Sequence, residues 1–179
     1  MKINNYKDLL TKVEEVTKQK NLDLSSGEDL SIGIMNLISV EEHLFFTFNK
    51  TKNNKYLDLL NEVRKTRTEL LKEIIKDYEG EVWCISKHLL AASMRIMEVG
   101  TKELKKGNNK KASALFEKSY KLYSLFWGLN LDIVKVGHPS NKEQKTITFI
   151  DEKGGEKGSI SVIQKLGTLI QKAIDCCRE

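Results

Sequence analysis

A glutamate and an arginine stand at positions where a helical pattern calls for apolar side chains. Apolar residues recur at steps of four and three along 30–48 and again along 56–74, but Glu41 and Arg67 interrupt these two series. Because buried charges are unfavourable unless paired, we predict that Glu41 pairs across a helical hairpin with Arg67 or with Arg64, one turn away. The first interpretation is a buried pair that fixes the register of the hairpin. The alternative is a functional polar pocket.

A second set of reactive side chains forms a polar stripe on the segment 81–106. At 100° per residue, one side of this helix carries Cys84, Lys87, His88, Arg95 and Glu98. We interpret the stripe as a solvent-exposed helix edge, because Arg95 and Glu98 have the spacing of surface ion pairs. The alternative is a cleft in which Lys87 and His88 lower the pKa of Cys84, since nearby cations favour the reactive thiolate.

Metal or cofactor chemistry has little support in the sequence. Helical bundles hold paired metal ions with carboxylates and Glu-x-x-His pairs, and this chain has no Glu-x-x-His. It also lacks the motifs of phosphate loops, acyl transfer and zinc proteolysis. We therefore expect no cofactor and no metal, and we keep a helical-bundle enzyme or metal-binding protein, with its site between helices, as a remote alternative.

The positive charge of the chain is concentrated in one region. The net charge is +5, and the segment 102–145 alone carries ten lysines against four acidic residues. The simplest interpretation is a solvated surface. The alternative is RNA or another nucleic acid bound through this segment, with the candidate contacts Lys102, Lys105, Lys106, Lys110, Lys111, Lys118 and Lys121.

The remaining pattern predicts a mainly α protein, an antiparallel bundle of four to five main helices. The chain contains only one proline, Pro139, and this scarcity of the strongest helix breaker favours long helices. Ser25 and Glu28 have the spacing of a capping box, which places the start of the second helix there. The helices are expected at about 6–20, 25–48, 56–74, 81–106 and 112–127.

After residue 130 the pattern changes. Alternating segments flank the glycine-rich stretch EKGGEKG, which predicts a small β-hairpin near 145–162, and an amphipathic C-terminal helix follows. We expect the helical bundle to occupy 1–130, with the β-hairpin and C-terminal helix of 131–179 packing on the same domain. No apolar leader or membrane span is evident, and the three cysteines form no metal or disulfide motif, so a cytoplasmic protein is expected.

The predicted function is a non-enzymatic helical binding module or adaptor. Aromatic residues cover more than one side of the fifth helix, and we expect a groove there for a protein partner or for a second copy in a homodimer. No membrane contact is expected. The aromatic residues are Tyr120, Tyr123, Phe126 and Trp127.

Overall fold

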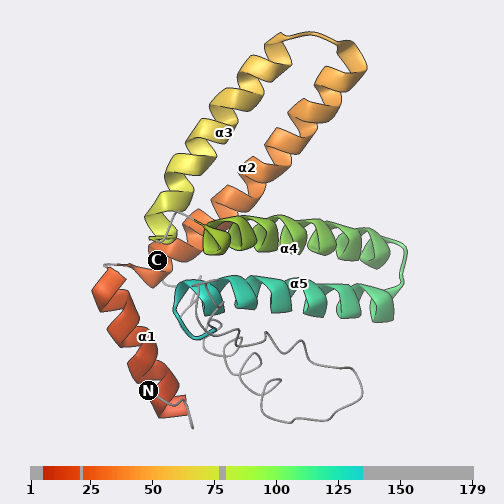
Figure 1. The fold of residues 1–179 in the computed structure, drawn as a ribbon. Helices are drawn as coiled ribbons and strands as arrows, with labels where there is room; N and C mark the ends of the chain where they lie inside the picture. The colour runs from red at the N-terminus through yellow and green to blue at the C-terminus, as the bar shows by residue number, and fades with distance from the viewer. Residues whose placement is uncertain (1–5, 21, 77–79, 135–179) are drawn as a thin grey trace, which may run out of the picture.

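The computed structural model describes residues 6–20, 22–76 and 80–134, and this part of the chain is all α, with five helices and no strand. Figure 1 shows two helical hairpins, α2 with α3 and α4 with α5, and a separate N-terminal helix, α1. Both hairpins are antiparallel. The bounds are α1 Tyr6–Lys20, α2 Leu24–Thr51, α3 Lys55–Ile74, α4 Glu81–Lys105 and α5 Asn109–Asn130.

The N-cap of α2 lies two residues before the predicted one. The Asp23 carboxylate accepts hydrogen bonds from the backbone N–H of Ser25 at 3.1 Å and from the Ser26 hydroxyl at 2.6 Å. The capping box predicted from Ser25 and Glu28 is therefore wrong. A carboxylate suits this place because it satisfies an otherwise unpaired amide and meets the positive end of the helix. As a result, the side chain of Glu28 is not used for capping.

The α2–α3 hairpin turns sharply at Lys52. This residue is left-handed, with φ +56°, and its backbone N–H donates to the carbonyl of Phe48 at 2.7 Å. Such a conformation ends a helix by satisfying a carbonyl of its last turn. The turn is short, so the two helices run back along each other as a pair.

The α4–α5 hairpin depends on small residues. Gly107, with φ +79°, forms the turn between the helices. Along both helices a small buried residue recurs every seven positions, which keeps it on the same side. Small side chains at a crossing let helix axes approach closely. These residues are Ser86, Ser93 and Gly100 on α4 and Ala112 and Ser119 on α5.

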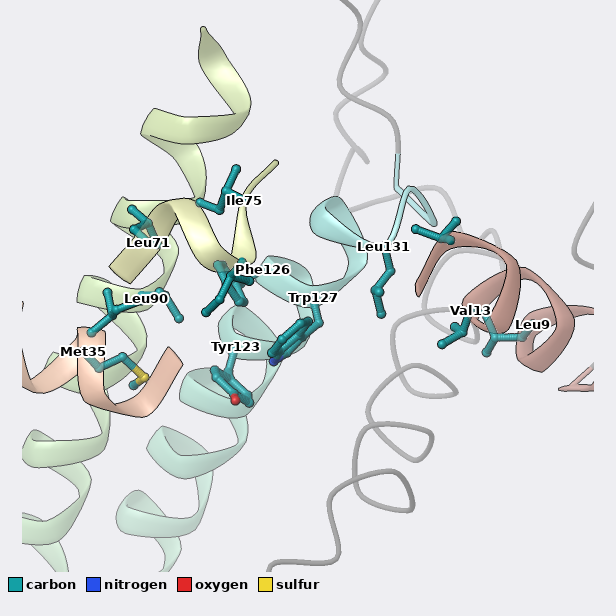
Figure 2. Packing of buried hydrophobic residues seen from close by; sticks show 13 residues of the cluster. Leu9, Val13, Met35, Leu71, Ile75, Leu90, Tyr123, Phe126, Trp127 and Leu131 are labelled. Atoms are coloured by element: carbon teal, nitrogen blue, oxygen red, sulfur yellow. The ribbon is translucent and has the colours of Figure 1, made fainter. Parts of the chain in front are cut away.

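The two hairpins share a core where they meet. Figure 2 shows Leu71 and Ile75 of the α3 end, Leu90 of α4 and Phe126 of α5 converging there. Leu131 continues this cluster toward α1, which contributes Leu9, Val13 and Val16. The core is therefore one apolar cluster to which all five helices contribute.

The arrangement differs from a single bundle, because the two hairpins extend in different directions from the shared core (Figure 1). Residues 131–134 form a turn. The predicted β-hairpin near 145–162 and the C-terminal helix lie outside the described residues, as does most of the predicted 131–179 segment. Among the described helices, none is long and apolar enough to cross a membrane.

Candidate binding groove

An apolar groove lies where the two hairpins diverge. It has a volume of about 330 Å³, within the range of pockets that bind ligands. Its polar lining groups are serine and tyrosine hydroxyls, and α2, α4 and α5 all contribute to it. The groove is lined by Ile32 and Met35 of α2, Ser93 and Met97 of α4, and Phe116, Ser119, Tyr120 and Tyr123 of α5.

The floor of the groove is fixed by buried contacts. Met35 and Tyr123 are buried, and the Tyr123 hydroxyl shares a 2.8 Å hydrogen bond with Ser31 Oγ. The Ser31 hydroxyl also lies 2.7 Å from the carbonyl of Glu28, to which it donates. Burial raises the pKa of Tyr123 above its ordinary value, so the phenol stays protonated and the floor carries no charge.

The rim of the groove is exposed and apolar. Ile32, Met97 and Tyr120 have exposed fractions of 45%, 40% and 37%. Large apolar side chains that line a depression and remain this exposed are typical of interaction surfaces. Leu104, 49% exposed, lies seven residues after Met97 and hence on the same side of α4, so the apolar surface continues along the hairpin.

Close packing of α4 on α5 shapes the wall of the groove. Ser93 Oγ donates to the carbonyl of Ser119 at 2.9 Å, and Ser119 Oγ donates to the carbonyl of Ser93 at 2.7 Å. Phe116 lies one turn before Ser119, and Gly100 lies two turns after Ser93. The Phe116 ring covers Gly100, because a Cβ built on this glycine would lie 2.7 Å from a ring carbon. The glycine therefore permits the position of Phe116 in the wall.

The four aromatic residues predicted to offer a binding face divide into two pairs. Phe126 and Trp127 are buried in the core, at 0% and 2% exposure, whereas Tyr120 and Tyr123 line the groove. Trp127 packs against Gly27 of α2, where an added Cβ would lie 3.1 Å from the indole. Trp127 thus holds α5 on α2 and does not itself offer a surface.

The structure brings together Glu41, Arg64 and Arg67 in the α2–α3 hairpin. Arg67 Nε donates to Glu41 Oε1 at 2.7 Å, and Arg64 Nε donates to Oε2 at 3.0 Å. Burial disfavours the charged form of Glu41, but the hydrogen bonds from Arg67 and Arg64 outweigh it, so the pKa of Glu41 lies below its ordinary value. Arg67 is buried and Arg64 is half exposed. Both carboxylate oxygens of Glu41 thus accept hydrogen bonds from the opposite helix.

The polar stripe of α4 does not converge on a cavity. Cys84 is a free, exposed thiol and His88 is exposed, while Lys87 between them is half-buried. Further along, the Arg95 guanidinium binds Glu98 on its own helix and Glu42 on α2. The stripe is therefore an exposed edge at one end and a link between hairpins at the other. Within the described ranges, no three His, Cys, Asp or Glu side chains could hold a metal ion.

The seven candidate lysines of residues 102–121 are all exposed. Two of them bind Glu103, which is buried: Lys106 Nζ lies 2.9 Å and Lys111 Nζ 3.4 Å from its carboxylate. The side-chain amide of Asn108 also donates to it at 2.9 Å. The hydrogen bonds from Asn108 and Lys106 lower the pKa of Glu103 from 4.5 to about 2. The single carboxylate of Glu103 therefore offsets only part of the positive charge of this turn.

Comparisons of the chain with protein-family models, with curated proteins and with solved structures find no match. The function must therefore be argued from the geometry of the chain itself.

Sequence reasoning selected the fifth helix but missed most of the groove. Ile32, Met35, Met97 and Phe116 fit the apolar pattern of any buried helix, so their types carry no signal of exposure. The heptad spacing of small residues on α4 and α5 was a usable signal, because it predicts where two helices approach most closely. That spacing would have identified Gly100 and, with it, the wall of the groove.

Proposed function

We propose that this protein is a helical binding module whose groove receives an amphipathic helix of a protein partner. The observation that carries the proposal is an apolar depression between three helices with Ile32, Met97 and Tyr120 exposed on its rim. A groove of this kind binds the apolar face of a helix through anchors spaced three to four residues apart. The buried floor offers a preformed shape, which lowers the entropy lost on binding.

An elongated partner fits better than a compact one. The apolar side chains follow the α4–α5 hairpin from Tyr120 toward Leu104, so the surface extends over several helical turns. A helix laid along it would bury successive anchors, whereas a small molecule would fill only the depression beside Met35 and Tyr123. This difference favours a peptide segment.

Nucleic acid is a weaker candidate for the same chain. At 100° per residue, the groove residues of α5 span an arc of about 100° around the helix axis. Lys118 and Lys121 each lie about 150° from the middle of this arc, so they point away from the groove. The Glu103 carboxylate also neutralises part of the α4–α5 turn. A polyanion would have to bind the outer face of α5 and would leave the apolar groove empty.

The test is selection of helical peptides by the full chain. A displayed library of amphipathic peptides of about 15 residues, roughly four turns, is selected on the wild-type protein, and the enriched peptides are measured against two variants. Met97→Arg places a charge in the groove. Val99→Arg is its matched control, because both side chains are 40% exposed on α4 and only Met97 lines the groove.

We expect enriched peptides to bind the wild type and V99R but to lose at least about tenfold in affinity for M97R, since a buried unpaired charge is costly. Equal binding to all three proteins, or no enrichment, would overturn the proposal. So would a dimer in sedimentation experiments that M97R dissociates and V99R does not, because a second copy would then be the occupant.

A further inference from the structure

The groove has a polar end on α2. Glu28, Ile32 and Met35 are spaced by four and three residues, so they lie along one side of the helix. Ile32 and Met35 line the groove, and Glu28 follows as the next turn toward the helix N-terminus. The Ser31 hydroxyl ties this turn to α5, because it contacts both the carbonyl of Glu28 and the hydroxyl of Tyr123.

The Glu28 carboxylate has no cationic partner in the part of the chain that the structure describes. It is half-buried. Burial, and then the neighbouring charge of Asp29, raises the pKa of Glu28 above its ordinary value. By contrast, guanidinium or ammonium groups pair with Glu41, Glu42, Glu98, Glu103 and Asp132. Glu28 is therefore a partly desolvated anion beside an apolar groove.

An aromatic ring lines the same groove as Ile32, which lies one turn of α2 from Glu28. Tyr120 is 37% exposed on the rim, and burial, with a contribution from Glu28, raises its pKa. A half-exposed ring on the rim and a carboxylate one helical turn from the groove together suit a cation on a flexible side chain, since the ring face attracts positive charge and the carboxylate accepts its hydrogen bonds.

From this arrangement we infer that Glu28 and Tyr120 form a subsite for a lysine or arginine of the partner helix, placed one to two turns from its apolar anchors. The inference rests on the proposed function and specifies the partner's chemistry: an amphipathic helix with a basic residue at one end. The subsite would fix the direction in which the helix lies. Apolar anchors alone would bind in either direction.

A charge-swap experiment on the full chain tests this assignment. The probe is a peptide enriched by the wild-type protein, prepared with its terminal basic residue as Lys, Gln or Glu. We expect Glu28→Gln to lower the affinity for the Lys peptide about tenfold and the affinity for the Gln peptide by less than about twofold. This difference is the coupling typical of close charge pairs. Glu28→Lys should prefer the Glu peptide. Asp29→Asn is the matched control, since Asp29 is exposed and lies about 100° around the helix from Glu28. It should leave the affinities for the Lys and Gln peptides unchanged.

The outcomes separate the two proposals. Peptides that bind and respond to M97R but show no coupling between residue 28 and the peptide charge would overturn the basic subsite and leave the groove intact. Equal losses of affinity for the Lys peptide in E28Q and D29N would also overturn the subsite, because the summed negative charge of this end of α2 would then explain both losses. Peptides whose affinity is unchanged by M97R would instead overturn the proposal that the groove is the binding site.

Discussion

The α2–α3 hairpin buries a carboxylate and one guanidinium group between its helices, with a second guanidinium at the edge, whereas the α4–α5 hairpin encloses two serines and a glycine. The ion cluster uses long side chains, which reach across the helix interface and hold it through directional bonds. The small residues let the backbones approach, so the large side chains of α5 must lie beside the contact. Tyr120, Tyr123 and Phe116 occupy that position, and the groove forms there.

This contrast shows how helix spacing decides where an apolar groove forms. At the middle of α2–α3, the polar groups at the interface pair with one another, and Glu41 and Arg67 are buried between the helices. At α4–α5, the polar groups also satisfy one another, but they leave aromatic and aliphatic groups partly uncovered. Function is therefore expected where close packing excludes large side chains from the helix interface. The following predictions test the two halves of this comparison.

The largest effect should come from breaking the ion cluster. Glu41→Ala leaves Arg67 buried without its carboxylate, and we expect a loss of about 3 kcal/mol in the free energy of unfolding. Arg64→Ala should lose less than about 1 kcal/mol, because the side chain of Arg64 is 54% exposed. Replacing Glu41 and Arg67 together by leucine should cost less than Glu41→Ala, since no charge is then buried alone. Urea unfolding measures all three, and equal losses for E41A and R64A would contradict the buried role of Arg67.

A smaller effect should come from adding one methyl group to the close-packed hairpin. Gly100→Ala gains helix propensity but forces the Phe116 ring to move, so we expect a net loss of roughly 1–2 kcal/mol. The displaced ring should also weaken peptide binding. Gly33→Ala is the matched control, because nothing lies within 4 Å of its added Cβ, and it should gain about 0.5–1 kcal/mol. Stabilisation by both substitutions would show that Phe116 is not held against Gly100.

The smallest of these effects should concern the α4–α5 turn, where the lysine partners of Glu103 are exposed. The pKa of Glu103 is lowered from 4.5 to about 2. The charge of Glu103 therefore stabilises the fold at pH values above 4.5, and this contribution is lost as the pH falls toward 2. Glu103→Gln should therefore be less stable than the wild type at neutral pH, with the difference shrinking in acid. Paired thermal unfolding across this range measures it. A difference independent of pH would mean that Glu103 acts through packing alone.

The helices could be predicted from the sequence because their apolar series are long and nearly free of proline. The pairing of Glu41 with Arg64 and Arg67 was also foreseeable, because a charge in an apolar series needs a partner and the hairpin turn fixes which residues face each other. The N-cap was assigned to the wrong residue because Ser25 and Asp23 both have capping side chains, and only the backbone geometry decides between them.

The arrangement of the two hairpins could not be predicted. Periodicity reports which side of a helix is apolar, but it does not report which other helix covers that side. The polar stripe illustrates this limit: Cys84 and Arg95 lie on the same helix edge, yet Cys84 is exposed and Arg95 reaches Glu42 on α2. The groove depends on this same arrangement, so the sequence could indicate only α5 as one of its walls.

The position of the groove beside the divergence of the hairpins has a mechanical consequence. The α2–α3 hairpin extends beyond Ile32 by nineteen residues to Thr51, a lever arm of about 30 Å. A rotation of roughly 5° at this joint would displace the far turn by about 2–3 Å over that length. The Arg95–Glu42 ion pair spans the two hairpins and opposes such a rotation. A helix wedged into the joint would therefore change the reach of Phe45 and Phe46, which project as exposed aromatic side chains on the outer half of α2.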